Sequence, residues 1–169
     1  DAAAAAAAAL AAGVTPEAVS RGLARFEALP GRGRRHQLAG GALLIDDSYN
    51  ANPDSMRAAI DVLAAQPAPR VLVAGDMAET GEQHVEFHAE IGRYAKQKGI
   101  DRFLATGPDM AHAVQAFGAA GRHYDATDML LRAVREAVRT PASVLVKASH
   151  SQRLDRVVES LLKDPGTAQ

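Results

Sequence analysis

Polar side chains suited to binding a ligand are concentrated between residues 46 and 52, directly after the apolar segment Leu43–Ile45. The residues concerned are Asp46, Asp47, Tyr49, Asn50 and Asn52. They supply two carboxylates, a phenol and two amides, which can bind hydroxyl groups and the edge or face of a base. Open α/β sheets bind ligands at the carboxyl ends of their strands, so this group predicts a ligand site at such an end.

The two carboxylates are not expected to share one role. Neighbouring residues on a strand point to opposite faces, so only one of Asp46 and Asp47 should face a ligand, where it could accept hydrogen bonds from ribose hydroxyls. The other is expected to hold the loop in place. Asn52 has an equally good alternative as the N-cap of the next helix, because Pro53 suits the first helical position.

A second acidic group follows the apolar segment Val71–Ala74. Asp76 and Glu79 should lie at the same edge of the sheet as Asp47, since both segments end there. They could orient an incoming ammonium group, or a lysine that does so. Carboxylates of turns and N-caps are the equal alternative for both residues.

A third group follows the apolar segment Val144–Val146 and begins with Lys147. Ser149 or Ser151 is expected to cap the helix that comes next. The free N–H groups of that helix, together with Lys147, would form a small anion site. A dipeptide carboxylate would fit such a site.

Arg32 lies in Pro30–Arg35, a segment with two glycines and three arginines. This composition predicts a hinge or linker rather than a helix or strand. The planar guanidinium of Arg32 suits phosphate or carboxylate, and a solvated linker arginine is the alternative.

His84 and His88 are spaced i, i+4 on a predicted helix, which is a spacing used by zinc ligands. Their order is H-V-E-F-H rather than H-E-x-x-H, and the sequence offers no obvious third ligand. We therefore predict a structural role for both histidines and no metal site in this chain.

Alternating strands and helices must position these groups. Strands are expected near residues 36–39, 42–46, 70–75, 102–106, 122–124 and 143–148. Helices are expected near residues 53–65, 83–98, 109–118, 127–139 and 152–163. The alternation predicts an α/β fold with a mostly parallel sheet and helices on both faces. Gly40-Gly41 predicts a hairpin that adds an antiparallel edge strand.

Two further helices are predicted before the linker, at residues 1–12 and 16–27, with Thr15 as N-cap of the second. The second helix is expected to bury Val19, Leu23 and Phe26. Residues 1–30 are too few for a domain, so we interpret them as the end of a preceding domain, and residues 31–169 as a domain of their own.

Composition limits the classes of partner. The chain has 169 residues, 47% of them hydrophobic, which is enough for a buried core. A net charge of −1 gives no field for nucleic acid or an anionic membrane, so neither partner is expected. No apolar run approaches the ~20 residues that span a bilayer. The absence of cysteine fits a reducing compartment.

Phosphate-binding loops are absent from the sequence. Neither G-x-x-x-x-G-K-[ST] nor G-x-G-x-x-G occurs, because Gly31 and Gly33 are not followed by a glycine at position 36. The chain alone should therefore lack a cradle for a triphosphate.

The chain resembles the Mur ligases, and most closely their MurF type. The strings that carry the resemblance are PGR at residues 30–32, DDSYNANPDSM at 46–56, VLVAGDMAETG at 71–81, GIDR at 99–102 and VLVKAS at 144–149. They occur in the family's order across nearly the whole chain. The family's K-G-S-R-S reads K-A-S-H-S here, with Ala148 and His150 as departures. Asp1 stands where the family has an asparagine, and that asparagine's role is not carried over.

The resemblance implies the Rossmann-like C-terminal domain of a cytoplasmic, ATP-dependent ligase of peptidoglycan precursor synthesis, preceded by the end of its central domain. The substrates implied are ATP, UDP-MurNAc-tripeptide and D-Ala-D-Ala, with ATP and Mg²⁺ bound mainly by the missing central domain. The fragment alone should be inactive. The implied nucleotide-binding residues are Arg32, Asp47, Tyr49, Asn50 and Asn52. The implied acceptor-binding residues are Asp76, Glu79, Lys147 and Ser149.

Two alternatives remain at the level of the sequence. One is a related ligase that adds a different amino acid, such as a diaminopimelate, glutamate or folylpolyglutamate ligase. The other is a binding module for a nucleotide or peptide that never catalyses a reaction.

Overall fold

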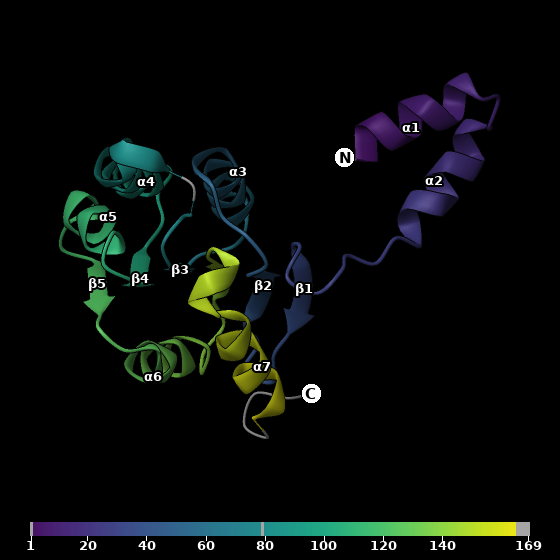
Figure 1. Cartoon of the computed structure of the whole chain (residues 1–169). Helices are drawn as coiled ribbons and strands as arrows, with labels where there is room; N and C mark the ends of the chain where they lie inside the picture. The colour runs from purple at the N-terminus through teal and green to yellow at the C-terminus, as the bar shows by residue number, and fades with distance from the viewer. Residues whose placement is uncertain (1, 79, 165–169) are drawn as a thin grey trace.

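A six-stranded sheet forms the centre of the molecule in the computed structural model, which describes residues 2–78 and 80–164 (Figure 1). The strands lie in the order β1-β2-β6-β3-β4-β5. Their bounds are β1 Arg34–Gln37, β2 Leu43–Asp47, β3 Arg70–Ala74, β4 Arg102–Thr106, β5 Gly121–Tyr124 and β6 Ser143–Lys147. All neighbours are parallel except β1 and β2, which form the predicted antiparallel edge.

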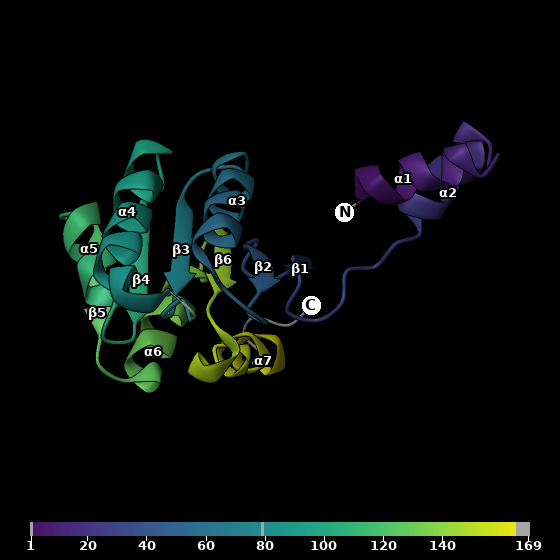
Figure 2. The same cartoon turned by 45° about the horizontal axis from the view of Figure 1, so that its top comes forward.

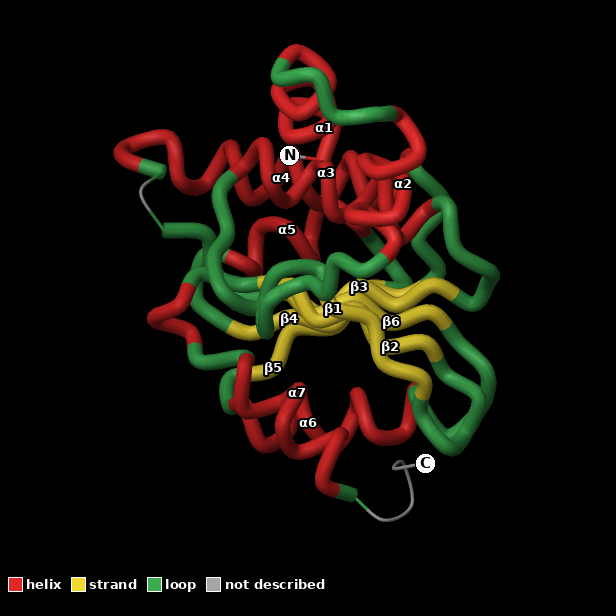
Figure 3. Tube along the Cα trace, turned by 90° about the vertical axis from the view of Figure 1, so that its right-hand side faces the viewer, coloured by secondary structure: helices red, strands yellow, loops and turns green. Residues whose placement is uncertain are grey.

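Helices cover both faces of the sheet, as predicted (Figure 3). The helices are α3 Pro53–Ala64, α4 His84–Gln97, α5 Met110–Phe117, α6 Thr127–Ala137 and α7 Asp155–Lys163. One apolar core, which includes Ile60, Ile91 and Met110, lies beneath α3, α4 and α5. A second core, which includes Val134 and Leu161, lies beneath α6 and α7. The α/β fold class is confirmed.

Two helices, α1 Ala2–Ala11 and α2 Pro16–Ala24, precede the sheet and stand apart from it (Figures 1 and 2). Thr15 caps α2 as predicted, because its Oγ1 accepts a hydrogen bond of 3.3 Å from the N–H of Ala18. Neither helix has a buried residue. The prediction that α2 buries Val19, Leu23 and Phe26 is therefore wrong for this chain, since Val19 is only half-buried and Leu23 and Phe26 are exposed.

Two predicted boundaries also need correction. Strand β1 begins at Arg34, two residues earlier than expected, so the last two residues of the Pro30–Arg35 segment are strand rather than linker. Helix α7 begins at Asp155 instead of residue 152. A short 3-10 turn, His150–Gln152, comes first, and Arg153 then adopts the left-handed conformation (φ 52°), which interrupts a continuous helix.

Within the described residues, no helix is both long and apolar enough to cross a bilayer.

Candidate functional site

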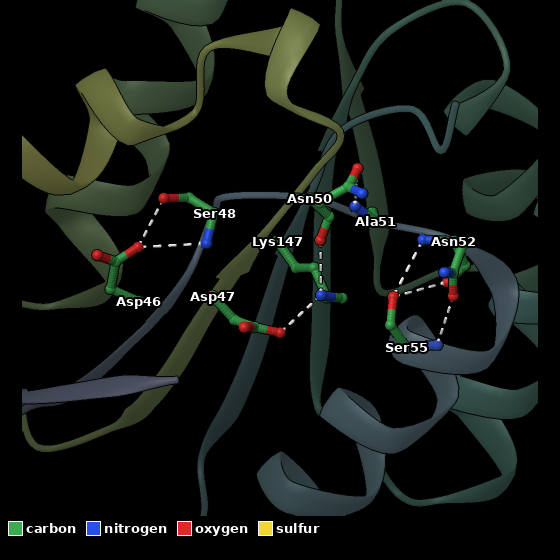
Figure 4. A network of polar contacts seen from close by, with 8 residues as sticks. All are labelled: Asp46, Asp47, Ser48, Asn50, Ala51, Asn52, Ser55 and Lys147. Carbon is green, nitrogen blue, oxygen red and sulfur yellow. Dashed lines mark hydrogen bonds and ion pairs between the residues drawn. The ribbon is translucent and has the colours of Figure 1, made fainter. Parts of the chain in front are cut away.

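Strand pairing brings the polar groups of β2 and β6 together at the carboxyl edge of the sheet. Asp47 and Lys147 are register partners in the parallel pair β2–β6. Lys147 Nζ lies 2.6 Å from Asp47 Oδ2 and donates a second hydrogen bond, of 2.8 Å, to the carbonyl oxygen of Asn50 (Figure 4). The side chain of Lys147 is only 4% exposed and that of Asp47 is 26% exposed. This ion pair forms the base of the site.

A cavity of about 470 Å³ opens above this pair. Its polar lining comprises Arg32, Asp47, Tyr49, Asn50, Asn52, Ser55 and Lys147. All five residues predicted to bind a nucleotide therefore face one cavity. The apolar lining comprises Ile45, Ala58, Ala59, Val62 and Leu145. An apolar wall beside polar groups suits a ligand with a flat ring and hydroxyl groups.

Arg32 and Tyr49 form a stacked pair at the rim of the cavity. The guanidinium carbon of Arg32 lies 4.2 Å from the centroid of the Tyr49 ring, within the range of a cation–π interaction. The ring of His150 approaches Tyr49 from another side, with centroids 5.8 Å apart. Tyr49 is nevertheless about half exposed, so its ring remains open to a ligand.

Asp46 holds the segment around Gly31 against the loop after β2. Its Oδ2 accepts a hydrogen bond of 2.8 Å from the N–H of Gly31, and its Oδ1 accepts bonds from the N–H and hydroxyl of Ser48. The N–H of Tyr49 also donates to the carbonyl of Gly31, at 3.0 Å. Asp46 thus has the structural position expected for one of the two carboxylates, and Asp47 faces the cavity.

The backbone conformation and surroundings of Gly31 favour glycine at this position. Its φ is +73°, and a Cβ at this position would lie 3.0 Å from Cβ of Tyr49. These contacts fix Arg32 to the sheet domain. Any hinge must therefore lie before Gly31, not across the whole Pro30–Arg35 segment.

Asn52 serves as the N-cap of α3. Its Oδ1 accepts a bond of 2.8 Å from the N–H of Ser55, and the hydroxyl of Ser55 accepts one of 3.0 Å from the N–H of Asn52 (Figure 4). This reciprocal capping box confirms the N-cap alternative for Asn52, and its amide nitrogen remains available to a ligand. The Asn50 side-chain oxygen accepts a bond from Ala51 N–H at 2.9 Å.

Asp76, a predicted acceptor-binding residue, is engaged inside the protein. Its Oδ1 accepts a hydrogen bond of 2.9 Å from the N–H of Met110, at the start of α5. Burial raises the pKa of the Asp76 carboxyl, because desolvation disfavours the charged form, and the bond from Met110 opposes this effect. Asp76 therefore has a structural contact: it accepts the first N–H of α5 from the loop after β3, although the N-cap residue of α5 is Asp109. Glu79 lies outside the described residues, as does Asp1.

His88 ties the loop after β3 to α4. It is fully buried, its Nε2 accepts the N–H of Met77 at 3.0 Å, and its Nδ1 lies 2.6 Å from the carbonyl of His84. Both ring nitrogens are thus engaged in a neutral imidazole that donates from Nδ1. His84 instead pairs with Asp109 at 2.7 Å. The described residues contain no group of three or more His, Cys, Asp or Glu side chains that could hold a metal ion.

Ser149 does not cap α7. It is buried, its hydroxyl lies 3.0 Å from that of Ser151, and its N–H donates to the carbonyl of Asp76. The N-cap of α7 is Leu154, without a side-chain hydrogen bond, so the predicted Ser cap is wrong. Lys147 pairs with Asp47 and Asn50 in the cavity and makes no contact with the start of α7 among the described residues. The predicted anion site from these parts is not assembled in this conformation.

Helix α3 contributes to the cavity, which was not predicted from the sequence. Ser55, Ala58, Ala59 and Val62 recur at helical spacing and line one wall. Val62 is 43% exposed on this face of the helix. That exposed valine, next to two small residues, was the available signal.

The family profile "Mur ligase, glutamate ligase domain" matches residues 25–150 of the chain. The chain belongs to the Mur ligase family. All residues that line the cavity described above lie within the part of the chain that this profile matches.

Relatives support this membership. The chain is 44% identical over 160 residues to the UDP-N-acetylmuramoyl-tripeptide--D-alanyl-D-alanine ligase of Escherichia coli, and the match covers 94% of this chain. Among solved structures, MurF from Acinetobacter baumannii superposes with a TM-score of 0.83 at 32% identity, covering 96% of this chain and 36% of that one. MurF from Thermotoga maritima in complex with ADP gives a TM-score of 0.78 at 27% identity, covering 90% of this chain and 35% of that one.

The chain spans about a third of the length of these relatives, for example 35% of the E. coli ligase.

Proposed function

We propose that this Mur ligase chain is the C-terminal, acceptor-side part of an ATP-dependent ligase that joins D-Ala-D-Ala to UDP-MurNAc-tripeptide. The observation that carries the proposal is the single cavity lined by Arg32, Asp47, Tyr49 and Asn50 at the carboxyl edge of the sheet. The name of the E. coli relative supports the choice of substrates, and the ADP complex of the T. maritima relative supports a nucleotide.

The cavity residues have chemistry suited to one face of a nucleotide. Arg32 is a donor for phosphate oxygens, Asp47 is an acceptor for ribose hydroxyls, and Tyr49 with Asn50 offers a ring and an amide to the base. The apolar wall from α3 would cover the sugar or base. A sequence without a phosphate-binding loop needs a second domain to hold the triphosphate.

Magnesium does not fit the described residues of this chain, which contain no suitable cluster of acidic or histidine ligands. We therefore assign Mg²⁺ to the portion of the protein that precedes this chain. Residues 1–30 are proposed to belong with that portion. Leu10, Leu23, Phe26 and Leu29 are exposed in the described structure, and a preceding domain would cover them.

In the proposed reaction, the carboxylate of the UDP-linked tripeptide accepts the γ-phosphoryl group of ATP, and the amine of D-Ala-D-Ala then attacks the activated carbonyl and displaces phosphate. The contribution of this domain is orientation of the reactants and exclusion of water when it closes over the nucleotide. We propose that the loops held by the hydrogen bonds of Asp76 and Ser149 surround the dipeptide. Glu79 keeps its proposed acceptor role.

Phosphate release by the full-length protein tests this function. ATP and UDP-MurNAc-tripeptide would be supplied with D-Ala-D-Ala, D-glutamate, diaminopimelate or no acceptor. We expect release only with D-Ala-D-Ala. Release with another acceptor would reassign the ligase within the family. No release with any acceptor, from protein that binds ADP, would favour a non-catalytic binding module.

A further inference from the structure

The Lys147 ammonium is nearly buried and already makes hydrogen bonds within the protein. Of its three N–H donors, one lies 2.6 Å from Asp47 Oδ2 and another 2.8 Å from the carbonyl of Asn50. The sequence suggested that this ammonium binds the carboxylate of the acceptor. That role needs a cation that is free to meet a ligand, and the side chain of Lys147 is only 4% exposed.

Asp47 retains one carboxylate oxygen for a ligand. Lys147 occupies Oδ2, and Oδ1 accepts no hydrogen bond from the residues that the structure describes. Asp47 lines the cavity beside Tyr49 and Asn50. The ion pair therefore fixes the rotation of the carboxylate and leaves a single acceptor oxygen available.

Lys147 also fixes the loop that carries the ring and amide of the site. Its two bonds join β6 to Asp47 and Asn50, the two ends of the segment 47–50 (Figure 4). Tyr49 lies between these residues in the sequence. Because Asp47 and Lys147 are register partners in adjacent parallel strands, the sheet itself delivers the ammonium to this point. One side chain thus sets the spacing between the carboxylate and the Tyr49 ring.

We propose that Lys147 is a positioning residue for the nucleotide, which acts through Asp47 and the 47–50 loop and does not touch the acceptor. This inference rests on the proposed function. It assigns to Lys147 an effect on the apparent affinity for ATP and none on that for D-Ala-D-Ala.

Steady-state kinetics of the full-length ligase test this assignment through separate KM values for ATP and D-Ala-D-Ala. Lys147→Gln keeps a donor for Asn50 but removes the charge. We expect it to raise the KM for ATP by about 5- to 50-fold, as for residues coupled in one polar network, with the KM for D-Ala-D-Ala within about 2-fold. In an Asp47→Asn background, Lys147→Gln should add less than about 2-fold, because its target is gone.

Lys98→Gln is the matched control. Lys98 also lies 2.6 Å from a carboxylate, Asp61, but on the surface of α3 and α4 and away from the cavity. Neither KM should change. If Lys147→Gln does not fold, Lys147→Arg retains the cation, and the same split between the two KM values decides the question.

A raised KM for D-Ala-D-Ala with an unchanged KM for ATP would overturn the proposal and return Lys147 to the acceptor site. Effects of Lys147→Gln and Asp47→Asn that simply multiply would overturn it as well. Calorimetry with ADP on the same proteins needs no turnover, so it tests Lys147 even if the wild-type ligase reaction proves to be different. There, Lys147→Gln should weaken ADP binding, and unchanged binding would contradict the proposal.

Discussion

At the scale of single residues, the site depends on contacts that orient a few side chains. Arg32 is the clearest case, because Gly31 and Asp46 fix its backbone while its guanidinium rests on Tyr49. A stacked arginine is already ordered before a ligand arrives, so less entropy is lost when it meets a phosphate. The same stack keeps the Tyr49 ring in place at the cavity rim.

Arg32→Met should therefore weaken nucleotide binding by about 10- to 100-fold, the range for loss of a charge-assisted hydrogen bond. Arg35→Met is the control, since Arg35 is an exposed residue of β1 that does not line the cavity. The measurement is calorimetry with ADP on the full-length protein. Equal affinities for the two variants would contradict the role of Arg32.

Asp76 gives a pH dependence of stability. Its pKa is raised in the folded state by burial, so the neutral form is favoured there. The stability from this group is present below the unfolded-state pKa of about 3.9 and is lost as pH rises through the raised folded-state value. Asp76→Asn keeps an oxygen for the N–H of Met110 and cannot ionise.

We therefore expect Asp76→Asn to gain stability relative to wild type as pH rises from about 4, until wild-type Asp76 is fully ionised. Urea unfolding of both proteins at several pH values between about 4 and 7 measures this difference. If the stability of Asp76→Asn relative to wild type stays constant or falls as pH rises, the pKa of Asp76 is not raised in the folded protein.

At the scale of elements, the alternation of strands and helices was predictable because it follows from apolar patterns and caps. The β2–α3 unit shows this well, with Leu44 and Ile45 buried and Asn52–Pro53 starting the helix. The partner of Lys147 was not predictable, since strand order decides that β6 lies beside β2. The break at Arg153 was also missed, because a left-handed arginine has no sequence signature comparable to glycine.

The cap of α3 permits a direct test at this scale. Asn52→Ala should lower the free energy of unfolding by about 1 kcal/mol, because the N–H of Ser55 loses its acceptor. Asn52→Ser retains a capping oxygen and should lie within a few tenths of a kcal/mol of wild type. Urea unfolding of the two variants distinguishes these outcomes. Equal losses would show that the capping box does not stabilise the helix.

At the scale of the whole molecule, the chain combines a packed sheet domain with two helices that have no buried residues. Phe26 and Leu29 follow α2 in the chain and are also exposed, at 73% and 64%. Exposed large apolar side chains gathered in one segment are typical of a surface that is covered in the complete protein. We therefore propose that the chain is one side of a larger enzyme.

Phe26→Ser should have different effects on the 169-residue chain and on the full-length protein. In the 169-residue chain the substitution should change stability by less than about 0.5 kcal/mol, because the ring is exposed. In the full-length protein it should lower the Tm, because a covered ring would be lost. Met129→Ser, on the exposed side of α6, should leave both unchanged. If full-length Phe26→Ser has the same Tm as the full-length wild type, no other domain covers Phe26.

The central claim is that the cavity above Asp47 forms one side of a nucleotide site. The most direct measurement is the affinity of the full-length protein for ADP, compared between wild type and Asp47→Asn, which keeps the shape of the side chain but removes its charge. Because a hydrogen bond to a charged acceptor is stronger than one to a neutral amide, we expect binding weaker by about 10-fold or more. An affinity equal to that of wild type would contradict the claim.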